Sequence, residues 1–236
     1  MKKHLLVWIF IAAFSMIKSQ TLLTVDPATT YQTMVGMGGH GINTDANYIK
    51  FLFDYLGCSA YRHWIEVDEC KTPHITLASI NSGNIAFKDL NANAISFFNT
   101  LKSKGVTVIA TPWSPPSCLK ANNCVQQRVN NVCCDPCGTY NCADDLNYLK
   151  WDCIDEYARY LSLWAKDFQT KTGISLYAIA MQNEPLFNEP YASAKMFSYQ
   201  YGPVLKATHD TFAKYPELQN IKFFGPEHMC NYGGNN

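Results

Sequence analysis

The fold is decided by the stretch LYAIAMQNEP, residues 176–185. Its first part is an almost continuous apolar run, which is typical of a strand in a parallel sheet that is covered on both faces. The run ends in three polar residues and Pro185, which cannot continue a strand as a hydrogen-bond donor. We predict a buried strand over Leu176–Gln182, with Asn183 and Glu184 projecting at its carboxyl end.

Four further short runs are rich in β-branched and aromatic residues, and each ends in polar residues, glycine or proline. They predict strands over Thr33–Gly38, Ser59–Ile65, Val106–Trp113 and Ile221–Gly225. Between the strands, apolar residues recur at helical spacing. This spacing predicts helices over Asp89–Lys104, Asp152–Thr172 and Ala192 to about Lys214, with Gly105 and Gly173 as left-handed stops after the first two. The alternation of strand and helix indicates the α/β class.

Five βα units with polar residues after the strands predict about the first five units of a (β/α)8 TIM barrel, whose active site lies at the strand carboxyl ends. The alternative is a doubly wound open sheet that binds a dinucleotide, because Gly36–Gly41 has G-x-G-x-x-G spacing. No amphipathic helix opens directly at Gly41, and no acidic residue closes a second strand at the expected interval. Close backbone packing at the mouth of a barrel explains these glycines better.

Composition excludes several classes of protein. The chain has 236 residues, of which 47% are apolar and 16% charged, so it carries enough apolar side chains for a sizeable core and is not disordered. Nineteen basic residues balance nineteen acidic ones, and no basic patch stands out, so we expect no nucleic-acid partner. Aromatic residues make up 14%, which suits sugar stacking and a filled core equally.

The amino terminus has the pattern of a secretory signal peptide over residues 1–20. Lys2 and Lys3 precede an apolar run over Leu5–Ile17, and small and polar residues follow around Ser19. The run is too short to span a bilayer as a helix, so no membrane span is expected after its removal. We therefore expect a secreted, extracellular protein.

Export would place the ten cysteines in an oxidising compartment, so disulfide bonds are expected. Seven of them lie from Cys118 to Cys153, which predicts a Cys-rich loop over residues 117–153 that is cross-linked by disulfide bonds. Cys134 and Cys137 have the spacing of a zinc or thiol-redox pair, but no second matched pair follows. Disulfides are favoured over zinc, and their connectivity stays open.

Glu184 is the candidate general acid, because it follows a buried strand and is preceded by an amide and followed by a rigid proline. The alternative is a strand-end glutamate that caps a helix or pairs with a cation. Trp113, in Thr111–Pro116, is either a sugar-stacking platform or a lid on the core, and the two are equally supported. Arg62 would anchor a carboxylate of substrate or of a neighbouring glutamate, or form a structural ion pair.

Glu227 ends the fifth predicted strand and invites pairing with Glu184 as the two carboxylates of a glycosidase. Their separation in the sequence does not give the distance between the two carboxyl groups in the fold. His40, His63 and His228 lack a close metal-ligand spacing, so we expect them to be rim or core residues and expect no metal site.

Taken together, these motifs resemble glycoside hydrolase family 30 in order and spacing. The residues that carry the resemblance are Gly36–Gly39, Tyr61-Arg62, Pro112–Pro116 with Leu119-Lys120, Met181–Pro185 and Gly225–Glu227. The resemblance implies a TIM barrel with an attached β-sandwich, to which a strand at Thr21–Val25 would contribute. It also implies retaining hydrolysis of β-linked glycosides without metal or organic cofactor.

The resemblance assigns roles by motif position. Glu184 matches the acid/base, Asn183 the residue that hydrogen-bonds the sugar 2-hydroxyl, and Trp113 a wall of the sugar site. Arg62 matches an arginine near the catalytic carboxylates. Glu227 matches a fifth-strand residue of the family and not its nucleophile, which lies on the seventh strand and has no counterpart here.

Since eight units need about 250 residues, the chain is expected to be an amino-terminal fragment that is inactive alone and prone to aggregate. Its expected organisation is a signal peptide at 1–20, a strand segment of a side β-domain at 21–32, and a partial catalytic barrel at 33–236. The expected function is retaining hydrolysis of a polysaccharide such as xylan, the favoured substrate, or β-glucan. A non-catalytic carbohydrate-binding protein and a Cys-rich extracellular scaffold are the alternatives. Oligomeric state and the choice of glycan stay open.

Overall fold

The structure is a computed structural model that describes residues 26–65, 67, 75–126, 146–186 and 191–227. The chain divides into two compact units, Met1–Met34 and Val35–Asn236. In the first unit, the described residues include a turn in which Thr29 donates its backbone N–H to the carbonyl of Asp26 and its hydroxyl to the Asp26 carboxylate. The predicted signal peptide and the strand at Thr21–Val25 lie outside the described residues. All elements below belong to the second unit.

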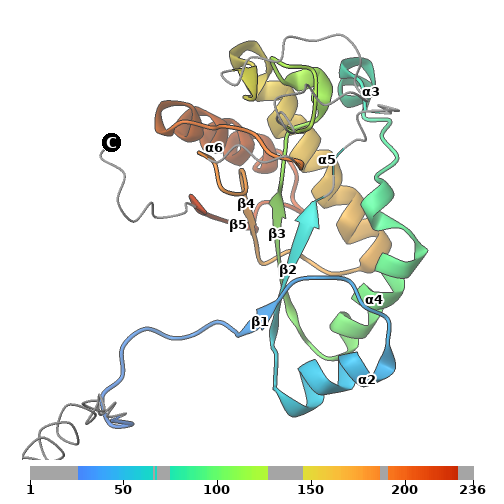
Figure 1. Ribbon diagram of the computed structural model, residues 1–236, viewed down its shortest axis with the longest axis vertical. Coiled ribbons are helices and arrows are strands. Elements are labelled where there is room, and N and C mark those ends of the chain that lie inside the picture. The colour runs from blue at the N-terminus through green and yellow to red at the C-terminus, as the bar shows by residue number, and fades with distance from the viewer. Residues whose placement is uncertain (1–25, 66, 68–74, 127–145, 187–190, 228–236) are drawn as a thin grey trace, which may run out of the picture. The chain divides into compact units, whose positions relative to one another are not determined.

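A parallel five-stranded sheet forms the centre of the second unit (Figure 1). Its strands are β1 (Gly38–Gly39), β2 (Ala60–Ile65), β3 (Thr107–Pro112), β4 (Ala178–Ala180) and β5 (Lys222–Phe224). They pair in chain order, β1-β2-β3-β4-β5. A dinucleotide-binding doubly wound sheet would reverse this order at a switch point. The predicted α/β partial barrel is therefore confirmed.

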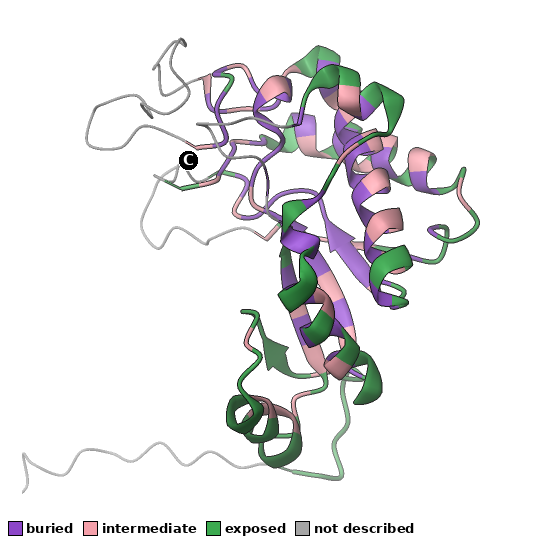
Figure 2. Ribbon diagram, turned by 90° about the vertical axis from the view of Figure 1, so that its right-hand side faces the viewer, coloured by how far each residue is buried: buried purple, intermediate pink, exposed green. Residues whose placement is uncertain are grey.

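Helices alternate with the strands and cover the sheet. They are α2 (Ala46–Ile49), α3 (Leu77–Ser82), α4 (Ala92–Ser103), α5 (Ile154–Thr172) and α6 (Ser198–Phe212). The Asn91 side chain accepts from the first turn of α4, and α5 ends at Gly173, whose φ of 63° is the predicted left-handed stop. Much of α5 is buried, whereas α2 and β1 are exposed (Figure 2).

Several predicted elements differ from the structure. The strand predicted at Leu176–Gln182 is only Ala178–Ala180, and the helix predicted from Asp89 begins at Ala92. The first strand is predicted at Thr33–Gly38 but is only Gly38–Gly39, and of the residues before it Met37 contacts β2, accepting from the backbone N–H of Ser59 and Ala60. The third predicted helix begins at Ser198 and not at Ala192. Residues 193–196 instead form hydrogen bonds to the backbone carbonyls of Val125, Asn147 and Pro185, which hold them in extended conformation across the connections after β3 and β4.

Cysteine pairing agrees with the sequence expectation only in part. Cys124 is disulfide-bonded, but Cys58 and Cys153 carry free thiols. The expectation of disulfide bonds did not say which cysteines pair, and these two do not. Burial raises the pKa of the Cys153 thiol, with the Asp152 carboxylate adding to the effect, so this thiol forms a thiolate less readily than usual. Most of the Cys-rich stretch lies outside the described residues, and the predicted disulfide-bonded loop stays a prediction.

Gly38 shows why glycine is needed where β1 meets β2. A Cβ at Gly38 would overlap the backbone carbonyl oxygen of Ala60, whereas a Cβ at Gly39 would meet nothing within 4 Å. Gly38→Ala is therefore expected to push β1 off β2 and lower the free energy of unfolding by about 2 kcal/mol. Gly39→Ala is the matched control and should leave urea denaturation unchanged. Equal midpoints for the two variants would contradict this account of the motif.

Lys120 is fully buried beside the turn that follows β3. Its Nζ donates to the backbone carbonyl of Ser193 at 2.6 Å. Desolvation holds the pKa of this ammonium well below its ordinary value. Lys120 thus joins the connection after β3 to the connection after β4, the two segments that carry the predicted site motifs.

This buried lysine predicts a pH dependence of stability. The unfolded chain keeps the Lys120 proton up to its ordinary pKa of about 10.4, whereas the folded chain releases it at lower pH. The unfolded state binds more protons in that window, so the free energy of unfolding should rise as the pH is raised from neutral toward about 9.5. Lys120→Met should flatten this slope in denaturation series, while Lys206→Met, at a side chain that is 77% exposed, should not. A slope that survives Lys120→Met would refute the assignment.

Candidate active site

The five candidate residues lie on β2 or directly after β3, β4 and β5. Arg62 is part of β2, Trp113 follows β3, Asn183 and Glu184 follow β4, and Glu227 follows β5. Because the strands are parallel, their carboxyl ends meet at one edge of the sheet. The structure brings all five residues together there, although up to 165 positions separate them in the chain.

Arg62 is the centre of this cluster. Its Nε and Nη2 donate to the two carboxylate oxygens of Glu227 at 3.0 and 2.9 Å, a two-point contact that lysine does not make. Nη2 also donates to the side-chain oxygen of Asn183 at 2.8 Å, and Nε to the hydroxyl of Thr111 at 3.2 Å. The guanidinium carbon lies 4.5 Å from the centre of the Trp113 ring. The carboxylate that Arg62 contacts is thus that of a neighbouring glutamate, an arrangement that a structural ion pair would share.

The Glu227 carboxylate is fully engaged in the ion pair with Arg62. Both of its oxygens accept from Arg62, and its backbone forms an isolated parallel bridge with Asn183. The side chains of Arg62 and Glu227 are 24% and 19% exposed, so the pair is largely shielded from solvent. Glu227 therefore holds Arg62 in place at the strand edge.

Glu184 has an unusual backbone. Its φ is 42°, in the left-handed region that residues other than glycine rarely adopt. The preceding residue is held on both sides, since Asn183 donates its backbone N–H to Pro112 at 2.9 Å and accepts from Arg62 through its side chain. The Asn183 amide nitrogen lies 3.4 Å from Oε2 of Glu184. Such strain is typical of functional sites, where surrounding contacts impose the conformation.

Trp113 is half-buried at the strand edge. Its ring stacks on Trp64, with centroids 4.8 Å apart and planes at 30°, and lies 6.3 Å from the His40 ring. Together with Arg62, these rings fix the orientation of the indole at the strand edge. Stacking of a sugar on Trp113 stays a prediction.

Two neighbours of the cluster were not singled out from the sequence. Gln182 is fully buried, and its Nε2 donates to the carbonyls of Trp113 and Asn183 at 2.7 and 3.0 Å, which ties the turn after β3 to the turn after β4. Trp64 lies two residues after Arg62 in β2. Strand alternation places both on one face of the sheet, and that period-two pattern is the sequence signal that identifies Trp64.

The described histidines lie apart from one another. His63 is buried against Asp89 in the core, His40 lies near Trp113, and His228 lies outside the described residues. The described part of the chain contains no group of three residues placed to hold a metal ion. Nor does any described helix have the length and apolar character that a membrane crossing requires.

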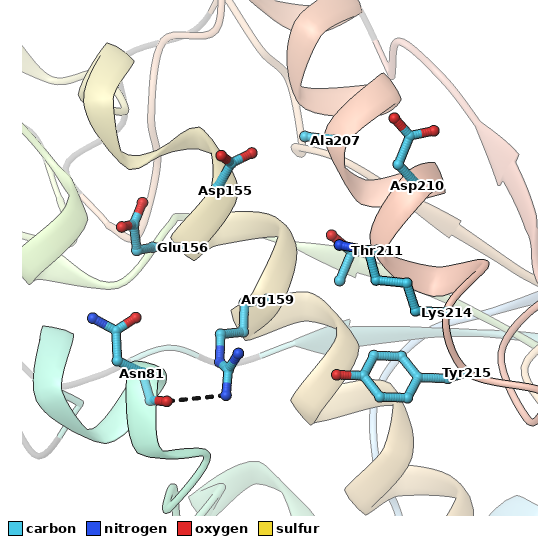
Figure 3. Close-up of a pocket in the computed structure, with 9 residues that line it drawn as sticks. All are labelled: Asn81, Asp155, Glu156, Arg159, Ala207, Asp210, Thr211, Lys214 and Tyr215. Carbon is cyan, nitrogen blue, oxygen red and sulfur yellow. Dashed lines mark hydrogen bonds between the residues drawn. The ribbon is translucent and has the colours of Figure 1, made fainter.

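A separate pocket lies on the outer, helical side of the fold. Residues from α3, α5 and α6 line it, among them Arg159, whose guanidinium donates to the backbone carbonyl of Asn81 (Figure 3). None of the five candidate residues lines it. In a barrel, this outer face contributes to packing, whereas chemistry takes place at the strand carboxyl ends.

Comparison with known proteins supports the resemblance inferred from the motifs. The chain is 30% identical over 82 residues to an endo-1,6-β-D-glucanase of Neurospora crassa and 28% identical over 109 residues to an endo-1,6-β-D-glucanase of Trichoderma harzianum. These alignments cover 35% and 44% of this chain, and 14% and 20% of the two relatives. No family model matches the sequence.

Among solved structures, the chain is similar to a glycoside hydrolase family 30 subfamily 8 xylanase from Clostridium acetobutylicum. The TM-score is 0.63 and the identity 25%, with 86% of this chain and 44% of the xylanase covered. The resemblance to glycoside hydrolase family 30 is thus confirmed. The chain spans less than half the length of each of these proteins.

Proposed function

We propose, from the confirmed resemblance to glycoside hydrolase family 30, that this chain forms part of a secreted retaining hydrolase of β-linked polysaccharides. The observation that carries the proposal is the cluster centred on Arg62, which gathers Trp113, Asn183 and Glu227 at one strand edge, with Glu184 next to Asn183. An aromatic wall, an oriented amide and a nearby carboxyl are the groups that a glycoside-cleaving site requires.

In this proposal, Glu184 is the acid/base. As an acid it protonates the glycosidic oxygen while a second carboxylate attacks the anomeric carbon, so that the sugar–oxygen bond breaks as a glycosyl ester forms. Glu184 then takes a proton from the water that hydrolyses the ester. Asn183, whose carbonyl oxygen is engaged by Arg62, presents its amide nitrogen to the sugar 2-hydroxyl, and the Trp113 ring packs on the sugar face.

The second carboxylate is the part of the mechanism that these residues do not supply. Glu227 is held by Arg62 through both oxygens. We infer that the nucleophile comes from a strand outside the described residues, as the resemblance implies, and that residues 1–236 alone bind glycan without cleaving it. This also keeps a non-catalytic carbohydrate-binding role as the alternative for this chain.

β-1,6-Glucan and xylan are the two substrates to compare. The names of both sequence relatives support β-1,6-glucan, and the xylanase structure supports xylan. We put β-1,6-glucan first, because the sequence relatives agree with each other. Xylan, which the sequence analysis favoured, is the second candidate.

The test is retention of the chain on each insoluble polysaccharide, followed by release of reducing ends. Residues 1–236 should be retained on β-1,6-glucan and release none. The protein translated from the complete reading frame should release them. Absence of retention on both β-1,6-glucan and xylan would overturn the proposed function, and retention without hydrolysis by the complete protein would favour the binding role.

Secretion and domain organisation are part of the same proposal. The charged start and apolar run within residues 1–20 support export, and residues 21–32 are proposed to join a side β-domain. Amino-terminal sequencing of the exported protein tests the first point, since a mature chain should begin near residue 21.

A further inference from the structure

The side chain of Gln182 bridges the two connections that carry the candidate residues. The register of β3 and β4 pairs residues up to Ala110 and Ile179. Further along, Pro112 has no backbone N–H with which to continue the ladder, although its carbonyl accepts from the backbone N–H of Asn183 at 2.9 Å. The Gln182 side chain crosses between the same two segments one residue later. A side chain thus takes over from the backbone ladder at the strand edge where the candidate site lies.

The amide nitrogen of Gln182 holds two backbone carbonyls at once. Nε2 donates to the carbonyl of Trp113 at 2.7 Å and to that of Asn183 at 3.0 Å. An amide NH2 group has two donors, so both are engaged. Gln182 is fully buried, and water therefore does not compete for these bonds. The two residues held in this way are the aromatic wall of the proposed site and the residue before its acid/base.

The oxygen of the same amide shows that the donors account for glutamine at this position. Gln182 Oε1 is buried and has no hydrogen-bond partner among the described residues. A buried acceptor without a partner costs free energy, which an apolar side chain of similar length would avoid. Exchanging the two ends of the amide would set its oxygen against two carbonyl oxygens, so the contacts fix its orientation.

The bond to the Asn183 carbonyl extends its effect to the backbone of Glu184. Because a peptide unit is planar, a fixed Asn183 carbonyl fixes the plane of the peptide that joins Asn183 to Glu184. The backbone N–H and the side-chain oxygen of Asn183 are held as well, by Pro112 and Arg62. The peptide therefore cannot turn to relax the left-handed φ of 42° at Glu184. Gln182 thus helps to set the direction in which the Glu184 side chain leaves the backbone.

We propose that Gln182 is a positioning residue of the proposed reaction. Its amide holds Trp113 and Glu184 in one fixed relation, so that a sugar packed on the indole presents its glycosidic oxygen to the acid/base carboxyl. This inference rests on the proposed function and extends it to a residue that acts through its neighbours. A misplacement of about 1 Å costs about 100-fold in rate, which is the effect expected when the amide is removed.

The first test compares two substrates in the protein translated from the complete reading frame. Gln182→Met keeps the length of the side chain and removes both donors. We expect kcat on β-1,6-glucan to fall about 100-fold. A dinitrophenyl β-glycoside departs without protonation, so its release in the first turnover should stay near the wild-type rate. Rates are taken per folded molecule, with the folded fraction measured by near-ultraviolet circular dichroism.

The second test restores a donor by protonation. In Gln182→Glu, burial against two carbonyl oxygens raises the pKa of the introduced carboxyl, so that at about pH 5 it carries a proton and donates to one of them. The kcat of Gln182→Glu on β-1,6-glucan should therefore exceed that of Gln182→Met at this pH. Comparing the two variants at one pH removes the titration of Glu184 itself from the result.

Gln200 provides the matched control. It is also a buried glutamine, and its Nε2 donates to the carbonyl of Leu149 at 2.7 Å, a bond that involves none of the five candidate residues. Gln200→Met should lower the midpoint of thermal denaturation and leave kcat per folded molecule unchanged on both substrates.

The outcomes separate the positioning role from the proposed function. If the complete wild-type protein hydrolyses no glycan, both fail. If it is active, equal losses on the two substrates in Gln182→Met would mean that Gln182 only supports the fold, and the proposed function would stand without the positioning role. Equal kcat for Gln182→Glu and Gln182→Met at about pH 5, or wild-type kcat in both, would refute the positioning role in the same way.

Discussion

Glu184→Gln is expected to lower the rate of glycan hydrolysis by about 1,000-fold, the middle of the range for loss of a general acid–base. Glutamine retains the size of the side chain and the contact with Asn183, but it cannot protonate the departing sugar oxygen. The measurement is kcat on β-1,6-glucan, made with the protein translated from the complete reading frame.

The leaving group provides an internal check on this prediction. A dinitrophenyl β-glycoside needs no protonation to depart, so the variant should form the glycosyl ester at a near-normal rate and then stall, which gives a burst of dinitrophenolate. Glu217→Gln is the matched control, because Glu217 lies on the surface, paired with Lys166, and should keep full activity. An equal loss on both substrates would show that Glu184 supports the site only structurally.

Arg62→Met has the second large expected effect, on stability and glycan binding together. The substitution leaves the shielded Glu227 carboxylate and the Asn183 side chain without their donor, and it removes the cation from the Trp113 ring. We expect the free energy of unfolding to fall by about 3 kcal/mol. Glycan binding should be lost as well, because both Asn183 and Trp113 lose their orientation. Urea denaturation and calorimetry measure the two effects.

A second substitution tests the stated cause. If the loss of stability in Arg62→Met comes from the unpaired Glu227 carboxylate, adding Glu227→Gln to that variant should restore part of the free energy of unfolding. Arg62→Lys should be intermediate, since an ammonium cannot make the two-point contact. Lys166→Met breaks an ion pair in which both side chains are more than a third exposed, and it should leave the midpoint in place. Comparable losses for Lys166→Met and Arg62→Met would contradict the assignment.

Elements whose ends are set by neighbouring residues were predicted accurately from the sequence, whereas elements set by distant contacts were not. The α5 helix was predicted with its end at Gly173, because spacing and a left-handed stop are properties of adjacent residues. β2 and β3 were predicted to within one residue at each end for the same reason. By contrast, α6 was predicted to start six residues too early, since residues 193–196 bond to segments that are distant in the chain.

The sequence by itself determined the class of fold, the parallel strands and the residues at their carboxyl ends, including Glu184, Asn183 and Trp113. Periodicity and strand-end position are local, and a parallel sheet brings strand ends to one edge whatever the loops do. Only the tertiary structure decided that Arg62 pairs with Glu227, that Trp64 stacks on Trp113, and that His63 lies against Asp89 in the core. Those are contacts between strands and loops tens of residues apart, and they depend on sheet register and side-chain packing that no local pattern specifies.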